Sequence, residues 1–245
     1  MIFTYHKIGQ QFELGITTVR KQTFGAHLDF LSGLGLEFVT ASEADTAYRP
    51  VRQVAITFDD GYESVYSDAC LEMEPRGIGG TVFPVVGSID GYNKWDVQLS
   101  RRPFKHLSWP QLRELSAGGF EVGSHTLSHR DLTRLDPKTL RRELGESRAM
   151  LEEHLGTGVT AISYPFGRFS ARVIEEALEA GYTHGFTSFP HDATDPMAIG
   201  RMTVYSVDGT SSLKRKLGLA PGYRFECLKN KFIARLSLGT TLVKR

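Results

Sequence analysis

The chain has 245 residues, of which 40% are apolar, and a formal net charge of +1. This length suits one large α/β domain or two small ones, and the composition is typical of globular proteins. The near-neutral charge gives no argument for nucleic acid as a partner. The two cysteines, Cys70 and Cys227, lie far apart, which favours reduced thiols over a disulfide framework or a cysteine metal site.

No signal for export is visible at the start of the chain. Met1 runs directly into IFTYH, without the basic and apolar regions of a signal peptide. The longest weakly polar stretch, residues 78–89, is too short for a membrane span and contains glycine and proline. On this basis we expect a cytoplasmic protein.

Strand and helix signals alternate along the chain. In chain order they predict a strand at 2–6, a helix at 24–35, strands at 53–58 and 81–86, a helix at 108–119, a strand at 120–125, a helix at 136–156, a strand at 159–164, a helix at 170–181, and strands at 182–189 and 201–207. Ser108, Asp136 and Ser170 are expected to cap the helices that follow them, and Pro84 favours an edge strand or a bulge.

This alternation predicts a mostly parallel sheet with crossover connections, and six or seven such units fit a barrel. In barrels of this type the chemistry lies on loops at the carboxyl ends of the strands. Polar clusters are therefore expected at strand ends, and the sequence places them there.

Four polar clusters follow predicted strands. His6 ends the first strand, Asp59 and Asp60 end another, His125 and His129 a third, and YPFG (164–167) a fourth. Asp-Asp-Gly is also ordinary turn chemistry. If Thr126 to His129 form a helical turn, the two histidines share a face. Two imidazoles and a carboxylate suit a divalent transition metal with open positions for water and substrate.

Three motifs resemble the signatures of the polysaccharide deacetylases, carbohydrate esterase family four. They are TFDDGY (57–62), SHTLSH (124–129) and YPFG (164–167), in the family's order, within a similarity that covers roughly residues 1–206. The opening TYHKI (4–8) resembles a subgroup in which a histidine motif comes first. The resemblance implies a distorted (β/α)7 barrel and metal-dependent hydrolysis of N-acetyl groups on the amino sugars of a polysaccharide or a lipid-linked glycan.

The resemblance also implies roles for individual residues. Asp60, His125 and His129 would bind one divalent ion, with zinc as the expected metal. Asp59 would be the general base and His6 the general acid that protonates the departing amine. The backbone N–H of Phe166 would stabilise the oxyanion.

Two departures from the family pattern matter. The family usually has an arginine that orients the base two residues before the motif's proline, where this chain has Ser163. Arg201 is our candidate replacement, although a structural or solvated arginine is an equally good interpretation. The family's late histidine motif is missing, which strengthens the case for His6. A hydrogen-bonded strand-end histidine remains the alternative for His6.

A loop from Ser88 to Phe104 is expected over the cleft. Tyr92, Trp95 and Trp109 are candidates for a sugar-stacking surface, although Trp109 suits a helix-start core position equally well.

Other functions remain open. HRD (129–131), with His191 and Arg201, matches an iron oxygenase pattern, but those enzymes are all-β and the pattern leaves TFDDG unexplained. The same fold also allows a deformylase or another C–N amide hydrolase. A carbohydrate-binding homologue with impaired catalysis is a further alternative.

The composition shifts after Gly209, so we divide the chain into a barrel (1–209) and a basic extension (210–245). The extension has nine Lys and Arg residues and one acidic residue, Glu226, interleaved with apolar residues. This pattern suits peripheral contact with an anionic membrane. A helix that packs on the barrel with a solvated basic face is the alternative.

Overall fold

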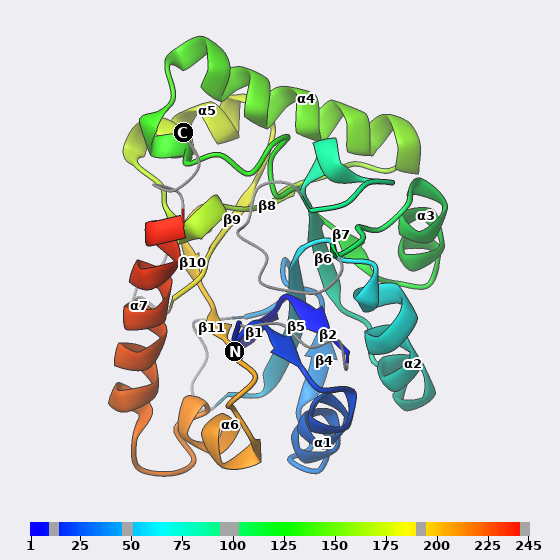
Figure 1. The fold of residues 1–245 in the computed structure, drawn as a ribbon, viewed down its shortest axis with the longest axis vertical. Helices are drawn as coiled ribbons and strands as arrows, with labels where there is room; N and C mark the ends of the chain where they lie inside the picture. Colours follow the sequence, from blue (N-terminus) through cyan, green and yellow to red (C-terminus); the bar gives the residue numbers. More distant parts are fainter. Residues whose placement is uncertain (10–14, 46–50, 94–102, 190–194, 241–245) are drawn as a thin grey trace.

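Parallel strands surrounded by helices form the centre of the computed structural model (Figure 1). The structure describes residues 1–9, 15–45, 51–93, 103–189 and 195–240, with the backbone alone for 235–240. The strands are β1 (Ile2–Tyr5), β2 (Lys7–Ile8), β3 (Thr18–Val19), β4 (Glu37–Val39), β5 (Gln53–Asp60), β6 (Thr81–Pro84), β7 (Glu121–Val122), β8 (Ala161–Ser163), β9 (His184–Thr187), β10 (Ile199–Gly200) and β11 (Met202–Thr203).

The helices lie around the strands. They are α1 (Lys21–Ser32), α2 (Cys70–Met73), α3 (Trp109–Ala117), α4 (Pro137–Leu155), α5 (Ala171–Glu179), α6 (Thr210–Lys216) and α7 (Tyr223–Thr240). Short π or 3₁₀ turns are η1 (Val65–Ala69), η2 (Glu74–Arg76), η3 (Val86–Ser88), η4 (Leu132–Arg134) and η5 (Pro165–Gly167).

The strands follow one another around a barrel. The sheet order β11-β1-β5-β6-β7 is parallel throughout, and a second parallel sheet has the order β10-β9-β8. A parallel bridge between Ser124 and Ile162 joins β7 to β8. On the other side, β10 leads through Arg201 into β11. The described strands therefore form a ring in which β10 and β11 are joined through Arg201 of the chain and not by strand pairing.

Side chains alternate between the inside and the outside of this barrel, as extended strands require. One buried cluster inside it includes Ala55, Phe83 and Phe186. The intervening residues, such as Val54 and Ile56, belong to a second cluster under the helices. Towards the carboxyl ends of the strands the interior becomes polar. This buried layer contains Thr4, Thr57, Asp59, Ser163 and Arg201.

The predicted helix caps agree with the structure. Ser108 and Gln111 form a capping box at the start of α3. Asp136 accepts hydrogen bonds from the N–H groups of Lys138 and Thr139 at the start of α4, and Ser170 caps α5. Such caps satisfy backbone donors that have no partner within the helix.

Two local predictions were wrong or incomplete. β6 is an interior strand between β5 and β7, although Pro84 favoured an edge. Pro84 is compatible with this position because it is the last residue of β6, and its carbonyl accepts a hydrogen bond from the N–H of His125 at 3.0 Å. The helical stretch from Val65 to Arg76 was not predicted. Its π and 3₁₀ turns break the regular helical spacing on which the sequence prediction relied.

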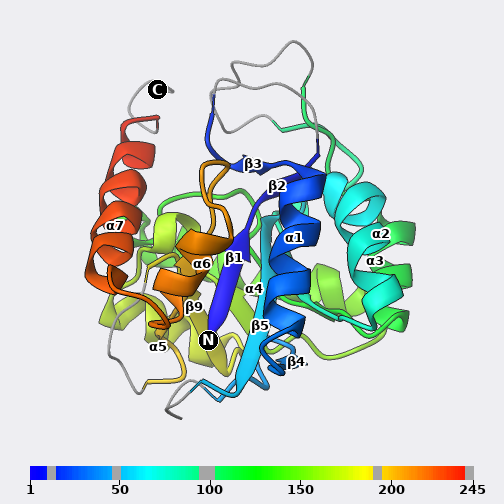
Figure 2. The ribbon, with the colours of Figure 1, turned by 90° about the horizontal axis from the view of Figure 1, so that it is seen from below.

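The segment after Gly209 packs against the barrel (Figure 2). Lys216 of α6 is fully buried, and its Nζ donates to the carbonyl of Thr203 at 2.8 Å. Lys216 also lies 3.3 Å from Asp208 and 3.5 Å from Glu226. Some of the basic residues of the extension therefore serve to hold it on the barrel.

Candidate active site

Asp60, His125 and His129 converge at the carboxyl ends of β5 and β7. Their potential ligand atoms all lie within 4.8 Å of one another. The Nε2 atoms of both histidines are 3.5 Å from Oδ1 of Asp60. Two atoms that bind a zinc ion at about 2.0–2.1 Å with tetrahedral angles lie about 3.4 Å apart. Both spacings to Asp60 are therefore close to those of a tetrahedral zinc site, in which three protein ligands would leave one position open.

Hydrogen bonding and burial prepare His125 and His129 to act as ligands. Nδ1 of His125 lies 2.7 Å from the carbonyl oxygen of Ser163, so it carries the proton and leaves the Nε2 lone pair facing Asp60. Burial is the main cause that lowers the pKa of His125, and it lowers the pKa of His129 further, with a contribution from the nearby His125. Both rings are therefore neutral at pH 7, as metal binding requires.

The loop that carries the two histidines differs from the expected helical turn. Thr126 and His129 both have positive φ, at 68° and 56°, in an irregular loop. The Thr126 hydroxyl accepts the N–H of His129 at 3.1 Å. Glu143 of α4 accepts the N–H of Ser128 at 2.8 Å and also the Ser128 hydroxyl. The histidines converge because side chains hold the loop, not because they share a helix face.

Asp59 lies inside the barrel beside the three candidate ligands. Arg201 binds it with two hydrogen bonds, from Nη1 to Oδ1 at 2.9 Å and from Nη2 to Oδ2 at 2.7 Å. Nη2 also donates to Ser163 Oγ at 2.8 Å, and that hydroxyl donates to Asp59 at 3.2 Å. Arg201 thus lies against the candidate base, and Ser163, at the family's arginine position, completes the contact.

Arg201 also fixes the electrostatics of Asp59. Burial alone would raise the pKa of Asp59, but the charge and hydrogen bonds of Arg201, helped by His125 and His6, lower it well below its usual value. The carboxyl group is therefore ionised at neutral pH and can accept a proton. Its low basicity limits the driving force for that transfer.

His6 follows β1 at the same end of the barrel. Burial lowers its pKa to about 4, against the opposing charge of Asp59, with a further lowering by Lys7. Its buried Nδ1 has no hydrogen-bond partner among the described residues. His6 is thus neutral at pH 7 and would become a proton donor only when negative charge develops close to it.

Phe166 adopts a left-handed conformation in η5, with φ 59° and ψ 11°. Its ring packs edge-on against His129, with centroids 4.7 Å apart. The next residue, Gly167, also has positive φ, and a Cβ there would lie 2.7 Å from the backbone N of Ser188. The YPFG turn therefore lies against one of the candidate metal ligands.

The polysaccharide deacetylase family model matches residues 47–185. The chain belongs to the polysaccharide deacetylase family. YxkH of Bacillus subtilis, which is named after this family, is 30% identical over 79% of this chain and 66% of its own length. The poly-β-1,6-N-acetyl-D-glucosamine N-deacetylase of Staphylococcus aureus is 23% identical over 69% of this chain and 61% of its own. The chain thus spans about two thirds or less of the length of these relatives.

Solved structures share the deacetylase fold. The Streptococcus pyogenes deacetylase PplD, in complex with acetate, superimposes with a TM-score of 0.74 at 20% identity, over 88% of this chain and 96% of that one. IcaB from Ammonifex degensii gives 0.67 at 26% identity, over 83% and 91%. The family model confirms the predicted family. Together with the ring of parallel strands, the structural matches confirm the predicted (β/α)7-type barrel.

This deacetylase barrel does not use its HRD sequence as an oxygenase would. The Asp131 side chain caps η4 and lies 2.7 Å from Arg168, and the carboxylate that is grouped with His129 is that of Asp60. The described chain is also a parallel α/β barrel and not an all-β fold. His191, which completed the oxygenase pattern, lies outside the described residues.

The aromatic residues suggested for sugar stacking have different environments. Trp109 stacks on His154, with ring centroids 3.8 Å apart, at the start of α3. Tyr92 is 51% exposed, and Trp95 lies outside the described residues. Antiparallel bridges join Tyr92 to Lys105 and Tyr62 to His106, so Lys105 and His106 lie beside TFDDGY.

Two further residues support the site but were not singled out from the sequence. His106 Nδ1 lies 3.0 Å from the carbonyl oxygen of Asp60, and its ring stacks on Tyr62. Glu143 is a buried acid on the core-facing side of α4, beside Leu144. A charged residue within that apolar stripe was the available signal for Glu143.

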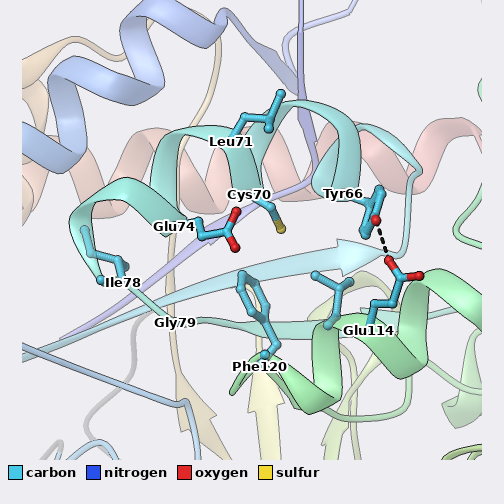
Figure 3. Close-up of a pocket in the computed structure, with 11 residues that line it drawn as sticks. Tyr66, Cys70, Leu71, Glu74, Ile78, Gly79, Glu114 and Phe120 are labelled. Atoms are coloured by element: carbon cyan, nitrogen blue, oxygen red, sulfur yellow. Dashed lines mark hydrogen bonds between the residues drawn. The ribbon is translucent and has the colours of Figure 1, made fainter.

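The larger of two cavities in the described structure lies away from the candidate active site. A cavity of about 430 Å³ lies between α2 and α3 and is lined by Cys70, Glu74, Glu114 and Phe120, among others (Figure 3). Phe120 directly precedes β7, so the cavity reaches the amino ends of the strands, opposite the candidate catalytic residues. A smaller cavity of about 230 Å³ is lined in part by Lys7, Tyr62 and Phe104 and not by the candidate metal ligands.

Proposed function

We propose that this chain removes N-acetyl groups from the amino sugars of a polysaccharide or a lipid-linked glycan. The observation that carries the proposal is the cluster of Asp60, His125 and His129 beside an ionised Asp59 that Arg201 orients. Family membership supports a deacetylation reaction. The name of the staphylococcal relative supports poly-N-acetylglucosamine as the first substrate to test.

We assign one divalent ion, zinc, to Asp60, His125 and His129. Two neutral imidazoles and one carboxylate are a common zinc-binding set, and the 3.5 Å spacings fit it. Such an ion, when bound, acidifies a water molecule and polarises the amide carbonyl.

Asp59 then accepts the proton of the attacking water. Its carboxylate is ionised and held in one orientation by Arg201 and Ser163, so the acceptor oxygen does not have to be ordered during the reaction. The backbone N–H of Phe166 would donate a hydrogen bond to the developing oxyanion, and the Phe166 ring lies against His129.

His6 delivers a proton to the departing amine. An amine is a poor leaving group unless it is protonated, so an acid is required. His6 is neutral before the reaction, and its pKa of about 4 rises as negative charge builds up on the substrate, so it takes up a proton from solvent and then passes that proton to the amine nitrogen.

The proposed function is tested by acetate release from β-1,6-linked N-acetylglucosamine oligomers and from other N-acetylated glycans. The wild type should release acetate, and Asp59→Asn should retain bound metal while losing about 10²–10⁴-fold in rate. His184→Ala is the control, because His184 lies on β9 outside the cluster. Full activity of Asp59→Asn would refute the assignment of the base.

The same assay separates the remaining alternatives. Release of formate or of another acyl product, without acetate, would identify a different C–N amide hydrolase on this fold. Tight glycan binding without release of any product would identify a carbohydrate-binding homologue. The contact between Arg201 and Asp59 argues against impaired catalysis, because it supplies the orientation that the missing motif arginine would give.

A further inference from the structure

A strip of exposed apolar and basic residues runs along α7. Phe225, Leu228 and Phe232 are 62%, 66% and 64% exposed, although residues of this size and type are usually buried. Their spacing of three and four residues places them on one face of the helix. Arg224 and Lys231 are exposed at one edge of that face. We refer to these five residues as the α7 strip.

The orientation of the α7 strip is fixed by polar contacts on the opposite side of the helix. Glu226 and Asn230 are fully buried. Glu226 pairs with Arg215 at 2.8 Å, and Asn230 donates to the carbonyl of Thr203 on β11 at 3.1 Å. Rotating α7 to bury the apolar strip would expose this network and break its hydrogen bonds. The apolar residues therefore face outward because of the fold.

Charge favours an anionic occupant for the strip. Glu226 is the only acidic residue between Thr210 and Arg245, and it is buried among cations, so it offers nothing to an approaching surface. A second copy of the chain paired through this strip would bring Arg224 and Lys231 of both copies together without a neutralising acid from α7. An anionic lipid surface neutralises both residues and also receives the apolar side chains.

We propose that α7 is an interfacial helix that binds the chain to the surface of an anionic membrane. Phe225, Leu228 and Phe232 would enter the boundary between headgroups and acyl chains, with Arg224 and Lys231 at the level of the lipid phosphates. Among the described residues, no helix is both long and apolar enough to span a bilayer. The contact is therefore one that lies on the membrane.

The position of α7 gives this contact a consequence for substrate access. α7 lies against η5, whose Phe166 contacts His129. In Figure 2, α7 rises beside the barrel in the same direction as β1, which leads to His6. The strip occupies the amino-terminal half of α7, so a membrane bound along it would lie against the side of the barrel, and α7 continues from there towards the end that carries His6. If the proposed deacetylation holds, a glycan on a lipid carrier would reach the site from the side of the barrel that α7 covers.

The test is flotation of the whole chain with vesicles of phosphatidylcholine alone and with vesicles that also contain phosphatidylglycerol. The wild type should bind only the anionic vesicles, and added salt should weaken this binding. Arg224→Gln with Lys231→Gln should lower the partition coefficient about 25-fold, since each basic residue near the surface contributes a factor of about five. Phe225→Ser with Leu228→Ser and Phe232→Ser should abolish detectable binding.

Matched controls keep the test specific. Leu71→Ser with Leu178→Ser removes two leucines that are 56% and 51% exposed on other helices, and should leave binding unchanged. Arg113→Gln with Lys138→Gln removes the same charge elsewhere. If the serine variant fails to fold, the glutamine variant alone decides the question. Vesicle binding needs no catalytic activity, so it stands or falls separately from the proposed function.

Three results would overturn the proposal. The first is wild-type protein that ignores anionic vesicles at low salt. The second is binding that the control variants lose as strongly as the α7 variants do. The third is a dimer in light scattering that the serine variant dissociates while vesicle binding stays unchanged, which would make a second copy the occupant of the strip.

Discussion

Replacement of Arg201 by methionine should destabilise the protein and remove the hydrogen bonds that hold Asp59 in position inside the barrel. Arg201 is fully buried and donates hydrogen bonds to Thr187, Thr57, Asp59 and Ser163. Arg201→Met leaves the 1% exposed Asp59 without its cation, and breaking a buried pair from one side costs about 3–5 kcal/mol. This is a large share of the roughly 5–15 kcal/mol that stabilises a domain.

A double-mutant cycle distinguishes this charge effect from lost packing. Urea unfolding at pH 7, with a chelator present in every sample, gives the free energies of Arg201→Met, Asp59→Asn and the double variant. Because the double variant has no buried unpaired charge, its loss should be smaller than the sum of the single losses by up to about 3 kcal/mol.

The control for this cycle is Arg141→Met, which removes a largely exposed partner of Glu176. It should cost less than about 1 kcal/mol. Additive losses for Arg201 and Asp59 would refute the conclusion that Arg201 acts on Asp59.

Three further predictions follow from other parts of the structure. His125→Ala should abolish tight retention of a divalent ion, measured as metal content after dialysis, whereas His184→Ala should retain it. In thermal melts, Gly61→Ala should destabilise the protein by more than about 1 kcal/mol, because φ is +68° and a Cβ would lie 2.6 Å from the Cα of Pro84. Gly145 lies in open space within α4, so Gly145→Ala should stabilise the protein by up to about 1 kcal/mol in the same measurement. Burial raises the pKa of Asp208, but Lys216 and other partners lower it below its usual value. The ionised Asp208 therefore stabilises the folded state above about pH 4, and this stabilisation is lost on acidification. In urea unfolding, Asp208→Asn should cost about 3 kcal/mol at pH 7 and progressively less below pH 4.

The sequence predicted those features that depend on local signals. Asp136 and Pro137 predicted the start of α4, because capping is a contact between neighbouring residues. The polar clusters were expected at strand ends because parallel strands place their carboxyl ends at the same edge. Neither inference required knowledge of which distant segments would meet.

Features that depend on distant contacts were harder to predict. Arg201 is 142 positions from Asp59, and only the closure of the barrel brings them together. Helical spacing wrongly suggested a turn for His125 and His129, since the actual loop is held by Glu143 from another element. The outward face of α7 follows from the burial of Glu226 and Asn230, and composition alone could not show which residues of the extension would be buried.

The adjacent carboxylates of TFDDGY coexist because the backbone separates them. Neighbouring residues of a strand point to opposite sides, and the positive φ of Asp60 and Gly61 ends β5 in a sharp turn. Asp59 lies inside the barrel, where Arg201 balances its charge. Asp60 faces two imidazoles whose burial keeps them neutral, and the Nε2 lone pair of His125 points at its carboxylate. Lone pairs that converge on a carboxylate repel it unless a cation lies between them, so the second negative charge is best explained by a metal ion.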